Sequence, residues 1–154
     1  MSSNNGILSL STLLFSMSPS LDSSSTYVFA TVRENPFTTI VDPNRPGDFE
    51  MFFREKEGWT LILQRSHAEK LGLAASFPCK KITLNVHSSL DAVGFLAAVT
   101  SRLAREVEIG VNPVSGFFHD HLFVPEGRER EVMDVLRRMA EEAKAEEGPT
   151  GRRL

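Results

Sequence analysis

The segment of residues 82–96 constrains the fold of this chain more than any other. From residue 82 to residue 87, apolar and polar residues alternate, which is the period-two pattern of a strand with one buried face. Ser88 and Ser89 follow and can cap a helix with their hydroxyls, and Asp91 would place an acid in its first turn. Apolar residues then recur at helical spacing. The sequence therefore predicts a strand, a polar turn and a helix that begins at the two serines.

Three further elements follow this helix. Residues 109–118 predict a second strand and residues 121–125 a third, with a tight turn at His119 and Asp120. Apolar residues at helical spacing then predict a second amphipathic helix that begins near Glu126. The second half of the chain is thus expected to run strand, helix, strand, strand, helix.

The first half predicts a comparable series of elements. A short amphipathic helix over residues 10–17 is followed by a strand over residues 27–32, which are rich in aromatic and β-branched side chains. Residues 51–54 and 59–64 predict a hairpin, and Ser66 is expected to cap a short helix. Side-chain identity between the halves is weak, so the repeat is inferred from the order of elements.

In this order and spacing of elements the chain resembles the ACT family, whose domains run strand, helix, strand, strand, helix, strand and commonly sense free amino acids. Residues 116–125, Gly-Phe-Phe-His-Asp-His-Leu-Phe-Val-Pro, and residues 86–94 are similar to segments of small stand-alone proteins with two tandem ACT modules. The resemblance implies an α+β fold of two ferredoxin-like (βαββαβ) modules, each an antiparallel sheet with helices on one face.

The expected modules divide the chain near its middle. We expect a first module over residues 7–76 and a second over residues 77–142, joined across residues 74–78, with disordered ends at 1–6 and 143–154. A last strand for the second module is not visible in the sequence. Either the first module or another subunit could supply it.

Composition restricts the partners of the chain. The net charge is −3 with no basic cluster, so we expect no nucleic acid partner. Serine and threonine interrupt the apolar stretch of residues 7–17, and no run approaches the about 18 apolar residues that span a bilayer. We therefore expect a cytoplasmic protein with no membrane partner. Cys79, the single cysteine, excludes an intrachain disulfide and is expected to be a buried thiol.

The resemblance also implies a ligand site, because ACT effectors commonly lie at an interface near the turn from the first strand to the first helix. Unpaired N–H groups at a helix start attract a carboxylate, and an acid such as Asp91 can receive an ammonium group. An amino acid presents both charges, although the same residues could simply cap a helix. The corresponding positions are His87, Ser88, Ser89, Leu90, Asp91, Val93 and Gly94, with Asn112, Pro113 and Val114 opposite.

Two further features invite a functional interpretation. Gly94 lies inside the predicted helix, where glycine costs about 1 kcal/mol of stability relative to alanine. We therefore expect another backbone segment or a ligand to approach closely there, and we favour backbone packing over a ligand. His119, Asp120 and His121 carry groups that could bind a metal. We favour polar contact with a ligand or a subunit partner, or turn chemistry, and we expect neither a metal nor a cofactor.

Signatures of common enzyme classes are absent from the sequence, including phosphate loops, nucleophile elbows and zinc motifs. The leading hypothesis is a regulatory or sensor module that forms a homodimer. It would bind an amino acid or related metabolite at an interface between modules or between subunits. One alternative is a small enzyme acting on an amino-acid-derived substrate, with His87, His119, Asp120 and His121 as acid–base groups. Another is a structural dimerisation module. The ligand and the downstream partner stay unidentified.

Overall fold

The computed structural model describes residues 6–42, 44–45 and 48–147. The chain forms two compact units, which we describe one at a time. The continuous unit consists of Ser23–Lys80, and the split unit combines Met1–Asp22 with Lys81–Leu154. The predicted boundary between residues 76 and 77 stays a prediction. Of the expected disordered ends, residues 1–5 and 148–154 lie outside the described residues.

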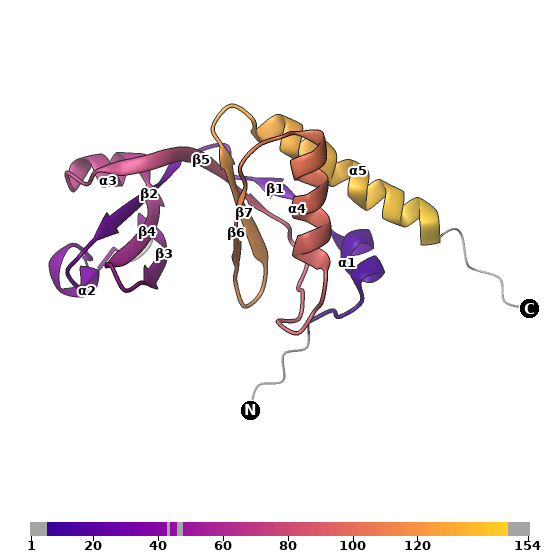
Figure 1. Ribbon diagram of the computed structural model, residues 1–154, viewed down its shortest axis with the longest axis horizontal. Coiled ribbons are helices and arrows are strands. Elements are labelled where there is room, and N and C mark those ends of the chain that lie inside the picture. The colour runs from indigo at the N-terminus through magenta and orange to yellow at the C-terminus, as the bar shows by residue number, and fades with distance from the viewer. Residues whose placement is uncertain (1–5, 43, 46–47, 148–154) are drawn as a thin grey trace, which may run out of the picture. The chain divides into compact units, whose positions relative to one another are not determined.

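The continuous unit has the βαββαβ order of a ferredoxin-like module (Figure 1). Its sheet order is β3-β4-β2-β5, and the paired strands are antiparallel. Apolar side chains from one sheet face and from α3 form its core. Its elements are β2 (Tyr27–Val32), α2 (Pro36–Thr39), β3 (Phe49–Arg54), β4 (Trp59–Gln64), α3 (Arg65–Lys70) and the first part of β5 (Ala75–Thr83).

The structure can be compared with several sequence-based expectations for this unit. The strand predicted over residues 27–32 and the hairpin that follows it are confirmed. The predicted cap at Ser66 is wrong, because α3 begins one residue earlier, at Arg65. Residues 74–78, across which we expect the two modules to join, lie almost entirely in β5, where Ala75 and Ser76 pair with β2. Cys79 is fully buried, as predicted.

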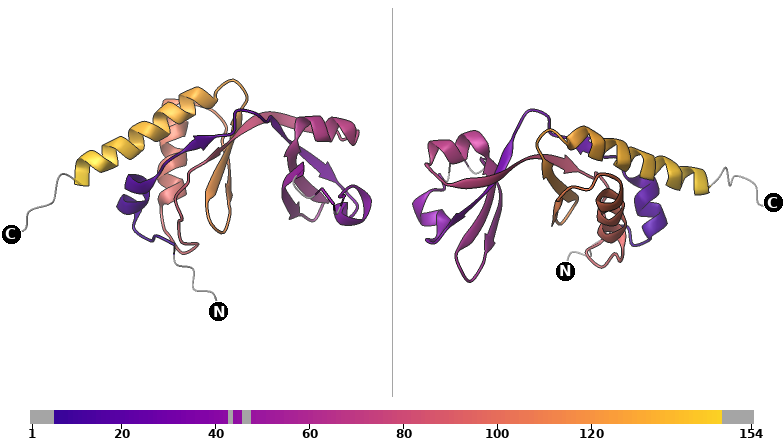
Figure 2. Two further views of the ribbon diagram at one scale, coloured as in Figure 1. Left: turned by 180° about the vertical axis from the view of Figure 1, so that it is seen from behind. Right: turned by 45° about the horizontal axis from the view of Figure 1, so that its top comes forward.

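The split unit places three helices on one face of its sheet (Figure 1). The sheet order is β1-β5-β7-β6. Helix α1 lies beside α5 in every view (Figure 2). Its elements are α1 (Leu10–Ser16), β1 (Ser20–Leu21), the end of β5, α4 (Phe95–Glu106), β6 (Asn112–Ser115), β7 (Asp120–Pro125) and α5 (Glu129–Glu147).

Strand β1 fills the edge for which the sequence offered no strand. Ser20 and Leu21 pair antiparallel with Thr83 and Ile82 at the end of β5. This short strand lies in residues 18–26, which lack strand periodicity. Because β1 comes from the same chain, the fourth strand of the second βαββα series is supplied from its N-terminal segment. An unpaired strand edge therefore gives no argument for a partner subunit at this position.

Helix α5 runs further than the sequence analysis expected. Residues 143–147, predicted as the start of a disordered tail, belong to α5. Glutamate, alanine and lysine fill this stretch and are good helix formers, and Lys144 bonds to Glu141 at 2.9 Å one turn earlier. Among the described residues, no helix combines the length and apolar character needed to cross a membrane.

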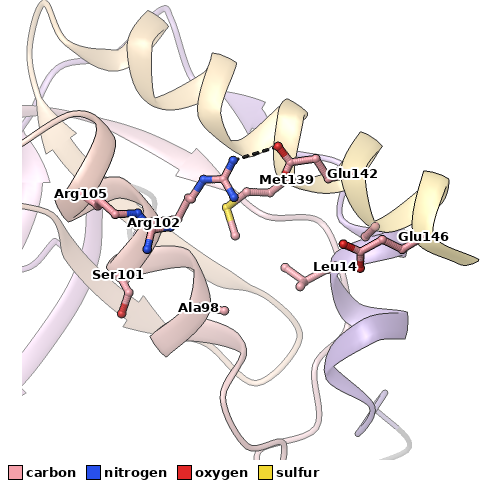
Figure 3. Close-up of a pocket in the computed structure, with 9 residues that line it drawn as sticks. Leu14, Ala98, Ser101, Arg102, Arg105, Met139, Glu142 and Glu146 are labelled. Atoms are coloured by element: carbon pink, nitrogen blue, oxygen red, sulfur yellow. Dashed lines mark hydrogen bonds and ion pairs between the residues drawn. The ribbon is translucent and has the colours of Figure 1, made fainter.

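Ion pairs join α4 to α5 beside a surface pocket of about 370 Å³ (Figure 3). Glu106 accepts hydrogen bonds from Arg138 on α5 and from Arg102 on its own helix. Arg102 also donates to Glu142 at 2.9 Å. The hydrogen bonds from Arg138 and Arg102 hold the pKa of Glu106 below its ordinary value, against the opposing effect of burial. Bonds to Glu142 and Glu106 raise the pKa of Arg102.

Replacing Leu13 on α1 tests whether the N-terminal segment is part of the core. Its side chain is fully buried among residues of the split unit. We expect Leu13→Ala to lower the free energy of unfolding by about 2–5 kcal/mol, because it removes buried methyl groups and leaves a cavity. The matched control is Leu8→Ala, whose side chain is 61% exposed and should matter little. Urea unfolding compares the two, and equal effects would contradict this role of α1.

The lowered pKa of Glu106 predicts a pH-dependent contribution to stability. A carboxyl group with a depressed folded-state pKa stabilises the fold above its unfolded-state pKa, and this contribution is lost as pH falls through the folded-state value. We therefore expect Glu106→Gln to lower Tm modestly at pH 7, and the difference from wild type to shrink as the solution is acidified below about pH 4. Glu57→Gln, in the exposed β3–β4 turn, is the control. A difference that stays constant down to pH 3 would contradict the assignment.

Candidate functional site

A second pocket, of about 180 Å³, lies in the split unit. Three segments build it: the loop after β5, the start of α4, and the end of β6 with the first residue of β7. Its lining residues are Ser88, Ser89, Leu90, Ala92, Gly94, Phe95, Leu96, Ala97, Ser115, Gly116 and Asp120. Five of these positions were predicted from the sequence: Ser88, Ser89, Leu90, Gly94 and Asp120.

Buried polar side chains distinguish this pocket. Ser89 and Asp120 are 6% and 4% exposed, and both line it. Asp120 begins β7, and its backbone carbonyl accepts a hydrogen bond from the N–H of Leu84 at 3.0 Å. Its two carboxylate oxygens accept the hydroxyls of Ser88 at 2.8 Å and Ser115 at 2.7 Å. The carboxylate is therefore held in one orientation by hydroxyls from the loop after β5 and from β6.

The start of α4 supplies hydrogen-bond donors to the same pocket. Its first residues, Phe95, Leu96 and Ala97, line the pocket, and no side chain caps this helix end. The first intrahelical bond runs from the N–H of Ala98 to the carbonyl of Gly94 at 2.8 Å. The N–H groups before it have no partner within the helix, and the helix dipole makes this end positive. The pocket thus combines an acceptor carboxylate with an electropositive helix start.

The predicted start of this helix is wrong by several residues. Strand β5 ends at Thr83 and not at residue 87, because Asn85 adopts a positive φ of 48°. Its side-chain amide donates to the carbonyl of Ser18 at 2.9 Å, which ties the chain down beyond the strand. Ser88 and Ser89 therefore do not cap α4. Ser89 instead accepts the N–H of Asp91 at 3.2 Å within a turn.

Gly94 has a different role from the one expected. It occupies the N-cap position with a φ of 91°, a left-handed conformation that glycine adopts without strain. The nearest atom to an added Cβ would be Leu10 Cδ2 at 3.8 Å, which is ordinary contact. The backbone conformation therefore explains why this residue is glycine. Gly94 does not lie inside the helix, and close packing does not require a glycine there.

Eight predicted site residues lie outside the pocket lining, and five of them are not histidines. Asp91 is exposed, and Val93 is 84% exposed. On the facing strand, Ser115 and Gly116 line the pocket where the sequence analysis expected Asn112, Pro113 and Val114. The three expected residues belong to β6, where they pair with residues 121–123 of β7. The position of Ser115 depends on the register of this hairpin, so the residue pattern alone gave no signal for it.

The histidines contact separate groups. His87 packs on Phe117 and Phe118, with ring centroids 6.5 and 5.8 Å away, and its buried Nε2 has no hydrogen-bond partner among the described residues. A ring nitrogen of His119 lies 3.4 Å from the carbonyl oxygen of Val86.

A ring nitrogen of His121 lies 2.9 Å from the Thr83 hydroxyl, whereas Asp120 binds the two serines. In the part of the chain that the structure describes, no three His, Cys, Asp or Glu residues gather in a way that could hold a metal. His119, Asp120 and His121 are therefore adjacent in sequence but engage different partners.

The larger pocket at the α4–α5 edge has a different character. Arg102 there is already paired with Glu106 and Glu142, and the charged residues that line it are exposed or half-buried. Those charges stabilise the packing of two helices. The smaller pocket, with its buried carboxylate and uncapped helix start, is the better candidate for a ligand site.

Similar solved structures agree with this architecture. A protein of unknown function from Vibrio cholerae, described as a possible transport protein, is 36% identical over 85% of this chain and 95% of its own, with a TM-score of 0.71. A protein from Agrobacterium tumefaciens is 19% identical over 75% and 84% of the two chains, with a TM-score of 0.59. A structure of aspartokinase alpha and beta subunits is 14% identical over 80% and 98%, with a TM-score of 0.55. The last two likenesses concern the fold alone.

Family models match most of the chain. One ACT domain model matches residues 5–80, and a second matches residues 76–138. No curated protein sequence matches. The predicted fold class, two ferredoxin-like ACT modules, is confirmed by these matches together with the strand orders of the two units. The chain belongs to the ACT domain family and carries two ACT domains in tandem.

Proposed function

We propose that the 180 Å³ pocket binds a small free amino acid and that the chain acts as a regulatory or sensor module. ACT domains are generally regulatory domains that bind small molecules, often amino acids. One observation carries the proposal for this chain: the buried carboxylate of Asp120 and the uncapped start of α4 line the same pocket.

The two polar groups match the two charges of an amino acid. The ammonium group has three N–H donors, and each Asp120 oxygen, which already accepts one serine hydroxyl, has capacity for another bond. The carboxylate of the ligand would accept N–H groups at the start of α4, where the helix dipole favours negative charge. In this assignment Asp120 takes the role that the sequence analysis gave to Asp91.

The rest of the pocket favours an amino acid with a small side chain. Leu90, Ala92, Phe95 and Leu96 form its apolar lining. The volume of about 180 Å³ is below the roughly 300–1,000 Å³ of sites for larger ligands. We therefore propose glycine, alanine, serine or a similarly small amino acid as the class of ligand. No observation favours an enzymatic role, because none of the described histidines lines this pocket.

Asp120→Asn tests the assignment of the ammonium contact. Screening the twenty amino acids by thermal shift finds the ligand, since a ligand at 100 times its Kd stabilises the fold by about 2.7 kcal/mol. Asp120→Asn should then weaken binding by about 1.5–3 kcal/mol, at least tenfold, because it removes a charge-assisted contact. Asp91→Asn, outside the lining, is the matched control and should bind like wild type.

Calorimetric titration well below the melting temperature of each variant measures these affinities. Two results would remove Asp120 from the site: unchanged affinity in the Asp120 variant, or equal loss in both variants. The absence of any thermal shift with the twenty amino acids at millimolar concentration would contradict the amino-acid function itself.

We also propose that the chain forms a homodimer, as ACT domains often do. Apolar side chains near the pocket support this proposal. Leu90, Val93 and Phe118 are 61%, 84% and 63% exposed, and they belong to the loops that contribute Leu90 and Gly116 to the lining. A second copy placed over these side chains would bury them and enclose the ligand.

Phe118→Ser tests this dimer surface. The substitution should shift the mass seen by light scattering from a dimer toward the 17.1 kDa chain, because it removes an apolar contact. Phe53→Ser is the matched control, since Phe53 is 59% exposed but belongs to the continuous unit. A monomeric wild type at micromolar concentrations, or identical behaviour of the two variants, would contradict the proposal.

A further inference from the structure

The segment of Gly6 and Ile7, which we call the strap, pairs with the loop that lines the pocket. The N–H of Ile7 donates to the carbonyl of His87 at 2.8 Å, and the N–H of Ser89 donates to the carbonyl of Ile7 at 2.9 Å. Together these bonds form a parallel bridge between Ile7 and Ser88. One residue of the strap, Ile7, therefore holds the backbone on both sides of Ser88.

Gly6 lies so close to this loop that a side chain cannot be accommodated without movement. A Cβ added there would lie 2.4 Å from the backbone nitrogen of Ser89 and 2.7 Å from the carbonyl carbon of Ser88. Real Cβ atoms essentially never lie this close to atoms to which they are not bonded, and both neighbours are backbone. With any residue other than glycine at position 6, the backbone of the strap or of the loop must therefore shift. Gly110 offers a contrast, since an added Cβ there would meet nothing within 4 Å.

The loop held by the strap positions the recognition carboxylate. The Ser88 hydroxyl donates to one oxygen of Asp120 at 2.8 Å, and Ser88 and Ser89 both line the pocket. Displacement of the loop would release that hydroxyl and leave Asp120 with the Ser115 hydroxyl as its remaining serine partner. The orientation of the carboxylate, and with it the recognition of an ammonium group, depends on this contact.

We propose that Gly6 and Ile7 are positioning residues of the amino-acid site, and that docking of the strap and binding of the ligand stabilise each other. The inference rests on the proposed function of the pocket. Because linkage is reciprocal, a ligand that binds tighter when the strap is docked must also favour docking. Binding of the ligand would then change how firmly the strap is docked. Docking of the strap would in turn strengthen the preference of the site for ligands that carry an ammonium group.

Gly6→Ala and Gly110→Ala provide a matched pair for the test. Titration calorimetry measures binding of L-alanine and of propionate, which has the same carboxylate and carbon chain but lacks the ammonium group. We expect wild type and Gly110→Ala to prefer L-alanine to the same degree. Gly6→Ala should reduce this preference at least fivefold, chiefly by weakening L-alanine binding. A variant that lost stability alone would keep the preference.

Hydrogen exchange in the wild type gives a second readout that needs no substitution. Saturating L-alanine should slow exchange of the Ile7 and Ser89 amides at least fivefold, because both donate across the strap contact. Unchanged exchange, or unchanged selectivity in a folded Gly6→Ala protein that binds L-alanine, would overturn the role of the strap and leave the proposed function standing. A wild type that binds no amino acid would instead overturn the proposed function, and the strap inference with it.

Discussion

The buried carboxylate of Asp120 is the constraint on which the rest of the split unit depends. A carboxylate with 4% exposure is costly unless hydrogen bonds replace its lost water. Ser88 and Ser115 provide those bonds from the loop after β5 and from the end of β6. The three segments are therefore fixed relative to one another by one side chain. The pocket lies where they meet the start of α4, so the interactions that stabilise this part of the fold also shape the candidate site.

The N-terminal segment completes the split unit in three ways. Strand β1 pairs with the end of β5, and Leu13 and Met17 fill the core beneath the sheet. The strap then reaches the loop that carries Ser88. The second ACT module has no last strand at its own C-terminal end. Strand β1 supplies that strand, although it lies more than fifty positions before the β5 residues with which it pairs. The same segment connects the core to the candidate site, which gives a physical basis for the proposed coupling between the strap and the ligand.

Local periodicity was sufficient to predict most elements but not their exact ends. Residues 27–32 and the β3–β4 hairpin were predictable because β-branched and aromatic residues alternate around a clear turn. The early part of β5 was missed because Pro78 and small residues resemble a linker, although tertiary pairing with β2 makes them a strand. The helix after Ser88 and Ser89 was placed too early because serine is favoured both at helix caps and in turns.

The candidate site was only partly predictable for the same reason. The loop residues Ser88, Ser89 and Leu90 follow directly from the strand-to-helix turn, which the sequence marks well. The choice between Asp91 and Asp120 as the acid proposed to receive an ammonium group does not follow from this turn, because it depends on which carboxylate is buried near the helix start. Burial of Asp120 results from hairpin register and from two serines distant in sequence, and neither is encoded in a local pattern.

Mapping of the bound ligand by NMR tests whether the pocket at the start of α4 is the amino-acid site. Titration of the ¹⁵N-labelled chain with the small amino acid that gives the largest thermal shift would follow the backbone amides of Phe95, Leu96 and Ala97, at the uncapped start of α4. If the amino acid binds in the 180 Å³ pocket, these three amides, with those of Ser88 and Asp120, show the largest changes and share one binding curve. Changes concentrated instead at Arg102, Glu142 and the other residues of the α4–α5 pocket would contradict binding there.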